Sequence, residues 1–182
     1  MSNPIYDIPL NRIDGADASL ADHEGSVLLV VNVASQCGLT PQYEALEKVH
    51  ENYRDKGFAV LGFPANNFGA QEPGNNDEIQ EFCTSKFGVE FPMYSKISVT
   101  GSDRHPLYDA LISAQPKRVE DDPSQLKEVL NKNNMGPKDD EDIMWNFEKF
   151  LLGRDGSVVA RFAPDIPPDD PRVTQTIEKA LG

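Results

Sequence analysis

Two segments of the chain are apolar along nearly their whole length, and a helical pattern lies between them. Residues 27–34 and 58–63 predict buried strands, and residues 41–56, which stop at Gly57, predict the intervening helix. Buried strands that alternate with helices place the chain in the α/β class, in which helices cover a central sheet.

The rest of the chain continues this alternation and closes it with an antiparallel hairpin. Residues 146–152 and 157–163 flank Gly153-Arg154-Asp155-Gly156, which is a hairpin signature. Further strands are predicted at 6–10 and 93–99, a helical turn at 124–131, and helices at 76–87, 105–114 and 171–181. Asn75 and Glu78 predict a capping box at the start of the helix at 76–87, and Gly88 predicts its end. A length of 182 residues favours one domain over 1–182, with a central mixed β-sheet and helices on both faces.

The balance of charge excludes several classes of partner. The chain has 30 acidic and 17 basic residues and a net charge of −13, so we expect no nucleic-acid partner and no anionic membrane surface. No apolar run is long enough to span a membrane, and residues 1–7 lack the features of a signal peptide, so we expect the cytosol. Two cysteines exclude a disulfide scaffold, and in the cytosol such a pair is expected to be free, catalytic or metal-bound.

Cys37 lies between the first buried strand and the helix that follows it. We expect that helix to begin with Thr40 as N-cap and Pro41 at the first helical position. Unpaired N–H groups and the positive end of the helix dipole favour a thiolate at such a place. A structural cysteine lies more often within a strand or on an apolar helix face, so Cys37 is the candidate nucleophile.

Three blocks of sequence carry a resemblance to a known family: NVASQCG at 32–38, GFPANNFGAQEPG at 62–74 and WNFEKF at 145–150. Their content and order resemble the signature blocks of the glutathione peroxidase family, and the similarity covers essentially the whole chain. The resemblance implies a thioredoxin-like fold and the reduction of peroxides. It also implies a catalytic tetrad of Cys37, Gln71, Trp145 and Asn146.

The chemistry of these residue types agrees with that implication. A thiolate at Cys37 attacks one oxygen of the O–O bond of hydrogen peroxide or an organic hydroperoxide, and a sulfenic acid forms on the sulfur. The developing charge needs hydrogen-bond donors, and Gln71, Trp145 and Asn146 all carry neutral N–H donors.

Cys83 has two interpretations. It is either an inert helix cysteine that packs like a small apolar side chain, or a resolving thiol that condenses with the Cys37 sulfenic acid. Its position resembles that of the resolving cysteine in the thioredoxin-dependent branch of the family, so we favour the second role. A disulfide needs Cα atoms within about 7 Å, so the helix at 76–87 would have to unwind during turnover.

The reductant implied by this resemblance is thioredoxin, with glutathione as the alternative. The basic residues that bind glutathione in other members are largely absent here; Arg161 remains, but Ala163-Pro164-Asp165 follow it. A peroxide sensor that relays oxidation to a partner protein would use the same two thiols. Turnover separates the possibilities, because an enzyme consumes peroxide repeatedly whereas a sensor reacts once and relays.

Other classes of protein fit less well. A dithiol oxidoreductase needs C-x-x-C, and Thr40 occupies the second cysteine position. The three histidines, at 23, 50 and 105, are scattered, so we expect no metal and no other cofactor. We expect a monomer or a weak homo-oligomer, in which the acidic segment 115–143 is either an interface or a solvated loop.

Overall fold

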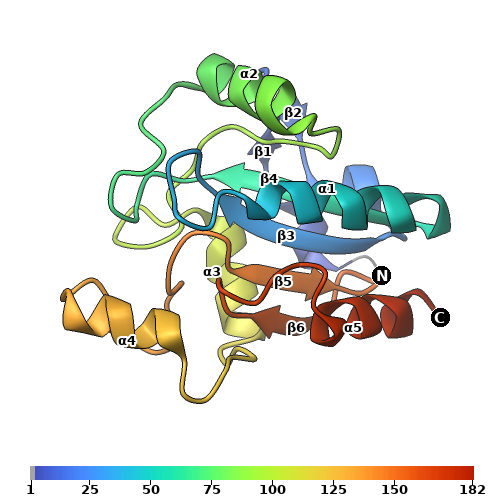
Figure 1. Cartoon of the computed structure of the whole chain (residues 1–182). Coiled ribbons are helices and arrows are strands. Elements are labelled where there is room, and N and C mark those ends of the chain that lie inside the picture. The colour runs from blue at the N-terminus through green and yellow to red at the C-terminus, as the bar shows by residue number, and fades with distance from the viewer. Residues whose placement is uncertain (1–2) are drawn as a thin grey trace.

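The structure is a computed structural model that describes residues 3–182, and a four-stranded sheet lies at its centre (Figure 1). Its strands are β3 (Val27–Val33), β4 (Phe58–Pro64), β5 (Lys149–Leu152) and β6 (Val158–Phe162), in the spatial order β4-β3-β5-β6. The pair β3–β4 is parallel, whereas β3–β5 and β5–β6 are antiparallel. The predicted mixed sheet is confirmed, and every residue of β3, β4 and β5 is buried, the polar Asn32 and Lys149 included.

Helices cover both faces of this sheet. The α-helices are α1 (Gln42–Tyr53), α2 (Asn76–Phe87), α3 (Pro106–Ala114), α4 (Gln125–Lys132) and α5 (Pro171–Leu181). Side chains alternate between the two faces along a strand, so Phe58 and Phe63 of β4 point in opposite directions. Phe58 packs against Tyr53 of α1, with ring centroids 5.9 Å apart, and Phe63 packs against Tyr108 of α3, at 6.3 Å.

Short elements complete the chain. They are a two-stranded sheet of β1 (Leu10–Asn11) and β2 (Asp17–Ala18), and the 3₁₀ helices η1 (Pro4–Asp7), η2 (Leu20–His23) and η3 (Arg54–Lys56). Figure 1 shows α2 stacked beyond α1 and β4, and α4 projecting away from the sheet. In residues 3–182 no helix combines the length and the apolar character that crossing a membrane requires.

Two predicted strands are wrong. Residues 6–10 do not form one strand, because the side chain of Asn3 accepts the N–H of Ile5 and starts the 3₁₀ helix η1, so that β1 begins only at Leu10. Residues 93–99 make only isolated bridges, at Met93 and Tyr94. Beyond Tyr94 the segment alternates between partners: Ser95 N–H bonds to Asn11 O at 2.9 Å, and Ile97 N–H bonds to Pro64 O of β4 at 2.9 Å, so no continuous ladder forms.

Local signals place the ends of several elements as expected. Asn75 and Glu78 form the predicted reciprocal capping box at the start of α2, and Gly88 ends that helix in the left-handed conformation with a φ of 60°. Gly57 likewise follows η3, the extension of α1, with a φ of 89°. These signals act over three to five residues, which is why the sequence alone was sufficient.

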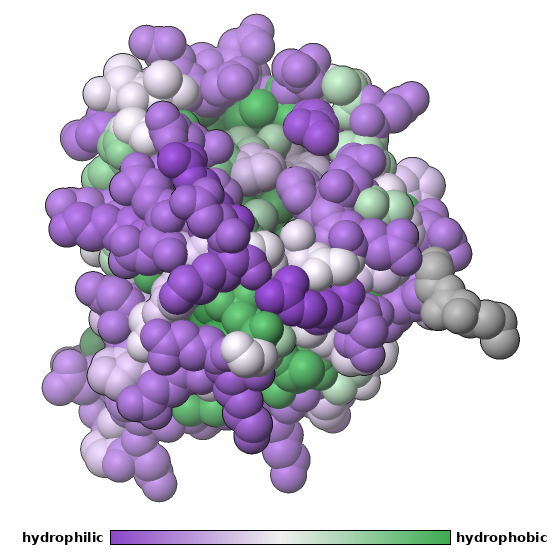
Figure 2. Space-filling model, turned by 90° about the vertical axis from the view of Figure 1, so that its right-hand side faces the viewer, coloured by the Kyte–Doolittle hydropathy of each residue, from purple (hydrophilic) through white to green (hydrophobic). Residues whose placement is uncertain are grey.

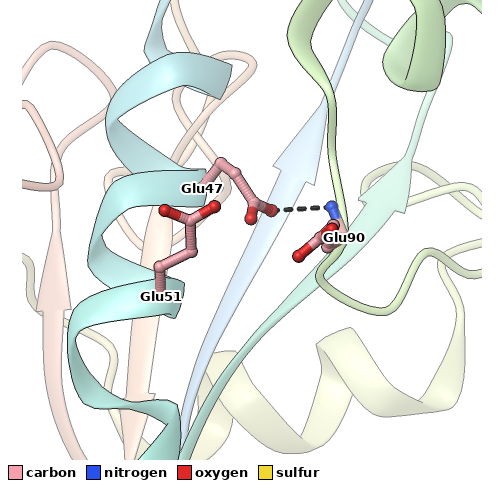
Figure 3. A group of neighbouring side chains, drawn as sticks. All are labelled: Glu47, Glu51 and Glu90. Carbon is pink, nitrogen blue, oxygen red and sulfur yellow. Dashed lines mark hydrogen bonds between the residues drawn. The ribbon is translucent and has the colours of Figure 1, made fainter.

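Glu47 of α1 ties this helix to the segment that follows α2. Figure 3 shows its carboxylate facing the backbone of Glu90, with Glu51 beside it. One oxygen, Oε1, accepts the N–H of Glu90 at 2.7 Å and that of Phe91 at 3.2 Å. The chain after α2 is therefore anchored to α1 by a side chain that is 6% exposed.

One face of the molecule is mostly hydrophilic (Figure 2). Figure 2 shows polar side chains over most of that face, with apolar side chains confined to smaller areas between them. The large apolar side chains instead fill the core around the sheet.

Candidate active site

The loop that carries Cys37 is closed by its own hydrogen bonds. Cys37 N–H donates to Thr40 Oγ1 at 2.9 Å, and the same hydroxyl donates to Ala34 O at 2.8 Å. Leu39 N–H donates to Cys37 Sγ at 3.3 Å. The sulfur is a free thiol, 8% exposed, in the turn between β3 and α1, as the sequence predicted. One backbone N–H is thus directed at the sulfur from within its own loop.

The predicted helix start at Thr40 is wrong in detail. Pro41 is the cap residue of α1, no side chain caps that end, and the first helical residue is Gln42. Thr40 does not act as N-cap because its hydroxyl is used inside the Cys37 loop. The same residue therefore fixes the position of the thiol instead of the helix.

Three other sequence-predicted residues meet beside this loop. Asn146 Nδ2 donates to Gln71 Oε1 at 2.9 Å, across 75 residues of sequence. Gln71 O accepts the N–H of Gln36 at 3.0 Å, so Gln71 is linked to the residue that precedes Cys37. Trp145 is adjacent to Asn146 and is 7% exposed, and its ring lies 5.5 Å from that of Phe68.

The amide of Gln71 and the indole of Trp145 both lie close to Gly69. A Cβ added at Gly69 would lie 3.4 Å from both Gln71 Nε2 and Trp145 Cη2, and the φ of Gly69 is +65°. Because Asn146 occupies the carbonyl oxygen of the Gln71 amide, the two N–H groups of that amide stay available to another acceptor. The arrangement can therefore present neutral donors to a developing oxyanion.

The turn at 145–147 is held by residues that sequence reasoning missed. Asn32 Nδ2 donates to Trp145 O at 3.1 Å, and Phe147 N–H donates to Asn32 O at 2.6 Å. Lys149 Nζ donates to Phe147 O at 2.6 Å and to Pro164 O at 3.0 Å. Phe147 has a left-handed φ of 71°, which is unfavourable for a non-glycine residue and needs such support.

Lys149 is fully buried, and burial lowers its pKa to about 7. The only sequence signal for this role was a lysine among the apolar residues of a predicted strand. Such a residue must find hydrogen-bond partners in the interior, which is why it ties two backbone segments together.

Cys83 lies on the buried side of α2 and is also a free thiol. Burial raises its pKa to about 11; a hydrogen bond with Tyr43 lowers it and the charge of Glu72 raises it. Tyr43 of α1 packs against Phe82 and Phe87 of α2, with ring centroids 6.5 and 5.4 Å away. Cys83 is therefore protonated and unreactive while α2 stays docked.

Arg161 is not available to a ligand. Its side chain is 1% exposed, and its Nε donates to Glu148 Oε2 at 2.6 Å. Its remaining N–H groups bond to backbone carbonyls of Gln115, Pro116, Glu141 and Asp142. Arg161 thus organises the acidic segment 115–143 from beneath, and it cannot serve as a surface cation for an anionic substrate.

Within residues 3–182, three carboxylates lie close enough together to hold a cation: Glu47, Glu51 and Glu90 (Figure 3). One oxygen of each lies within 4.8 Å of the other two. Glu47 already accepts two backbone N–H groups, and Glu90 pairs with Arg54 at 3.4 Å. We therefore assign this group the structural role described above.

Comparisons with known proteins agree with these features. A family model described as "Glutathione peroxidase" matches residues 5–112. "Thioredoxin/glutathione peroxidase BtuE" of Escherichia coli is 50% identical over 100% of both chains. "Hydroperoxy fatty acid reductase gpx1" of Synechocystis is 43% identical over 99% of this chain and 97% of the other. The crystal structure of Trgpx in apo form has a TM-score of 0.70 and 33% identity over 97% of this chain and 95% of that one. The thioredoxin-like fold is confirmed.

Proposed function

Because this chain belongs to the glutathione peroxidase family and is a peroxidase, we propose that it reduces hydrogen peroxide and organic hydroperoxides through Cys37. The hydrogen bond between Asn146 and Gln71, beside Trp145 and joined to Gln36, is the observation that carries the proposal. Cys37 attacks the peroxide, Gln71, Trp145 and Asn146 supply hydrogen bonds to the leaving oxygen, and Cys37 becomes a sulfenic acid.

Cys83 then resolves the sulfenic acid by forming a Cys37–Cys83 disulfide, which thioredoxin reduces. A relative named "Thioredoxin/glutathione peroxidase" leaves both reductants open. The buried position of Arg161 and the net charge of −13 favour thioredoxin, because glutathione is an anion and a cationic surface would be needed to hold it. Thioredoxin instead attacks a protein disulfide through a mixed disulfide.

Repeated turnover tests the proposed enzyme against the alternative of a peroxide sensor. Protein at one hundredth of the peroxide concentration is expected to consume all the peroxide when thioredoxin, its reductase and NADPH are present. The measurement is NADPH oxidation together with residual peroxide. Consumption of only one peroxide per protein molecule would favour the sensor.

We also predict that disulfide formation unwinds α2. Ile79 and Cys83 of this helix are buried, and Phe82 and Phe87 pack partly buried against Tyr43, so unwinding exposes some apolar surface. That cost is offset because a disulfide forms in place of a reactive sulfenic acid. The Cys83 carbonyl accepts the N–H of Val89 at 3.2 Å, and unwinding at Cys83 also releases this bond at the C-terminal stop. Hydrogen exchange in peroxide-treated protein is expected to be faster than in dithiothreitol-treated protein over residues 77–87.

An internal control for this measurement lies three residues beyond the helix. The N–H groups of Glu90 and Phe91 bond to Glu47, so their exchange is expected to stay slow in both forms. Equal protection over 77–87 in both forms, with the Cys37–Cys83 bond verified by mass spectrometry, would contradict the prediction.

A further inference from the structure

The turn that carries Trp145 and Asn146 has a conformation that its own residues disfavour. Phe147, which directly follows Asn146, has a left-handed φ of 71°. A non-glycine residue keeps such a conformation only where the surrounding structure enforces it. Asn32 of β3 bonds to Trp145 O and to the N–H of Phe147, so the carbonyl of Phe147 is left for another donor.

Lys149 supplies that donor from inside the protein. Its Nζ donates to Phe147 O at 2.6 Å and to Pro164 O at 3.0 Å, and its side chain is fully buried. Burial lowers the pKa of this amine to about 7, and the amine keeps two N–H groups even when it is neutral. Both carbonyls are therefore satisfied in either protonation state.

Pro164 O is also bonded to the helix that follows the nucleophile. Gln42, the first residue of α1, donates its Nε2 to Pro164 O at 2.8 Å. Gln42 comes directly after the loop that holds Cys37. The two hydrogen bonds to Pro164 O and the one to Phe147 O thus join the start of α1 to the turn at 145–147, and we call them the Pro164 bridge.

The same two segments also meet through aromatic rings, but this contact is less exact. Phe147 packs edge-to-face against Tyr43 of α1, with ring centroids 5.5 Å apart. Aromatic pairs are favourable over a range of centroid separations, about 4.5 to 7 Å. Hydrogen bonds tolerate a much narrower range, about 2.7 to 3.2 Å between N and O. The Pro164 bridge therefore sets the distance between the two segments more exactly than the ring contact does.

We propose that Lys149 is a positioning residue for peroxide reduction, an inference that rests on the function proposed above. Through the Pro164 bridge it holds the donors Trp145 and Asn146 in register with Cys37. Both of its hydrogen bonds go to backbone carbonyls, so it acts on the reaction through the residues that it positions.

The substitution Lys149→Met tests this role because it keeps an unbranched side chain and removes the donor. Reduced protein is mixed with one equivalent of hydrogen peroxide, and peroxide loss gives the rate constant of the first step. A displacement of about 1 Å can cost about 100-fold in rate, so we expect this rate constant to fall about 10- to 100-fold.

Alkylation of Cys37 by iodoacetamide separates positioning from damage to the nucleophile. This reaction needs the thiolate but no donor to a leaving oxygen. Its rate constant, measured on the Cys37 peptide by mass spectrometry, is expected to stay within about threefold of that of the unaltered protein. A parallel fall of the peroxide and alkylation rate constants in Lys149→Met would overturn the proposal.

The fluorescence of Trp145 gives a direct signature of the turn, because it is the only tryptophan of the chain. Trp145 is 7% exposed in the structure. When Phe147 O loses its donor, the emission is expected to shift to longer wavelength and acrylamide is expected to quench it more strongly. A slow Lys149→Met with unchanged emission and quenching would contradict the positioning role.

A double-mutant cycle tests whether Lys149 acts through the donors. In protein that already carries Asn146→Ala, the substitution Lys149→Met is expected to lower the peroxide rate constant much less than it does alone, because residues that act as one unit are not additive. Two effects that multiply in full would show that Lys149 acts independently and would overturn the inference.

The matched control is Arg154→Met. The Arg154 side chain also ties separate backbone segments together, through the carbonyls of Gly25, Lys56 and Leu181, none of which belongs to the site. This variant is expected to unfold at a lower temperature while its peroxide rate constant and its Trp145 emission stay unchanged. A control variant that is slowed as much as Lys149→Met would show that any loss of such ties has this effect.

A second variant covers the case in which Lys149→Met does not fold. Gln42→Leu breaks the Pro164 bridge from its other end, at a side chain that is only partly buried. The peroxide rate constant is expected to fall about fivefold, with alkylation of Cys37 unchanged. An unchanged peroxide rate constant in folded Lys149→Met or, if that variant is unfolded, in Gln42→Leu would overturn the proposal. Failure of the underlying function looks different: the unaltered protein would then consume peroxide no faster than Cys37→Ser.

Discussion

Peroxide consumption is expected to fall at least about 1000-fold when Cys37 is replaced by serine. A serine hydroxyl is far less acidic than a thiol and has no comparable reactivity toward an O–O bond, so the nucleophile is lost. The loop itself should persist, because Leu39 N–H can donate to a serine oxygen as it does to Cys37 Sγ, and the bonds of Thr40 are unchanged.

This expectation is measured as peroxide loss in single-turnover and steady-state assays. Far-ultraviolet circular dichroism and thermal unfolding verify that Cys37→Ser is folded. The matched control is Cys83→Ser, which removes the other thiol and is expected to reduce the first equivalent of peroxide at an unchanged rate. Undiminished turnover in Cys37→Ser would remove the assignment of the nucleophile.

Cys83→Ser is expected to lose at least about 100-fold of its steady-state turnover with thioredoxin. Without Cys83 no disulfide forms inside the chain, so the Cys37 sulfenic acid persists and a second peroxide can oxidise it to a sulfinic acid. The burst of one peroxide per molecule should remain. The combination of an intact burst with lost turnover is the signature of a resolving thiol, because an inert core cysteine would affect neither.

The same assay decides between the two reductants. In the unaltered protein kcat/KM is expected to be higher for thioredoxin than for glutathione, because Arg161 is committed to Glu148 and offers no surface cation. Ser85→Ala is a suitable control for the Cys83→Ser variant: Ser85 lies two residues from Cys83 in the same helix and is exposed, and its substitution leaves both thiols in place. A higher kcat/KM with glutathione would place the chain in the other branch.

Local sequence determined those parts of the fold that depend on a few neighbouring residues. The capping box of Asn75 and Glu78, the stop at Gly88 and the hairpin turn at 153–156 could each be predicted, because every partner in the signal lies within a few positions. The buried strands could be predicted for a similar reason, since an unbroken apolar run excludes a solvated surface.

The sequence alone also located Cys37 between a strand and a helix, and its resemblance to the family identified Gln71, Trp145 and Asn146. The contacts among them were not. Gln71 and Asn146 are 75 residues apart, and their hydrogen bond exists only because the loop after β4 and the turn before β5 meet beside β3.

The tertiary structure decided which polar residues are buried and what they bond to. Thr40 was predicted as a helix cap and instead closes the Cys37 loop; Arg161 was a possible surface cation and instead pairs with Glu148 in the interior. The signal for Lys149 was limited to a lysine among the apolar residues of a predicted strand, and its partners became known only from the structure, which buries it fully. A polar side chain has the same sequence pattern whether water or protein surrounds it, and only the packing of distant segments determines its partners, its pKa and its role.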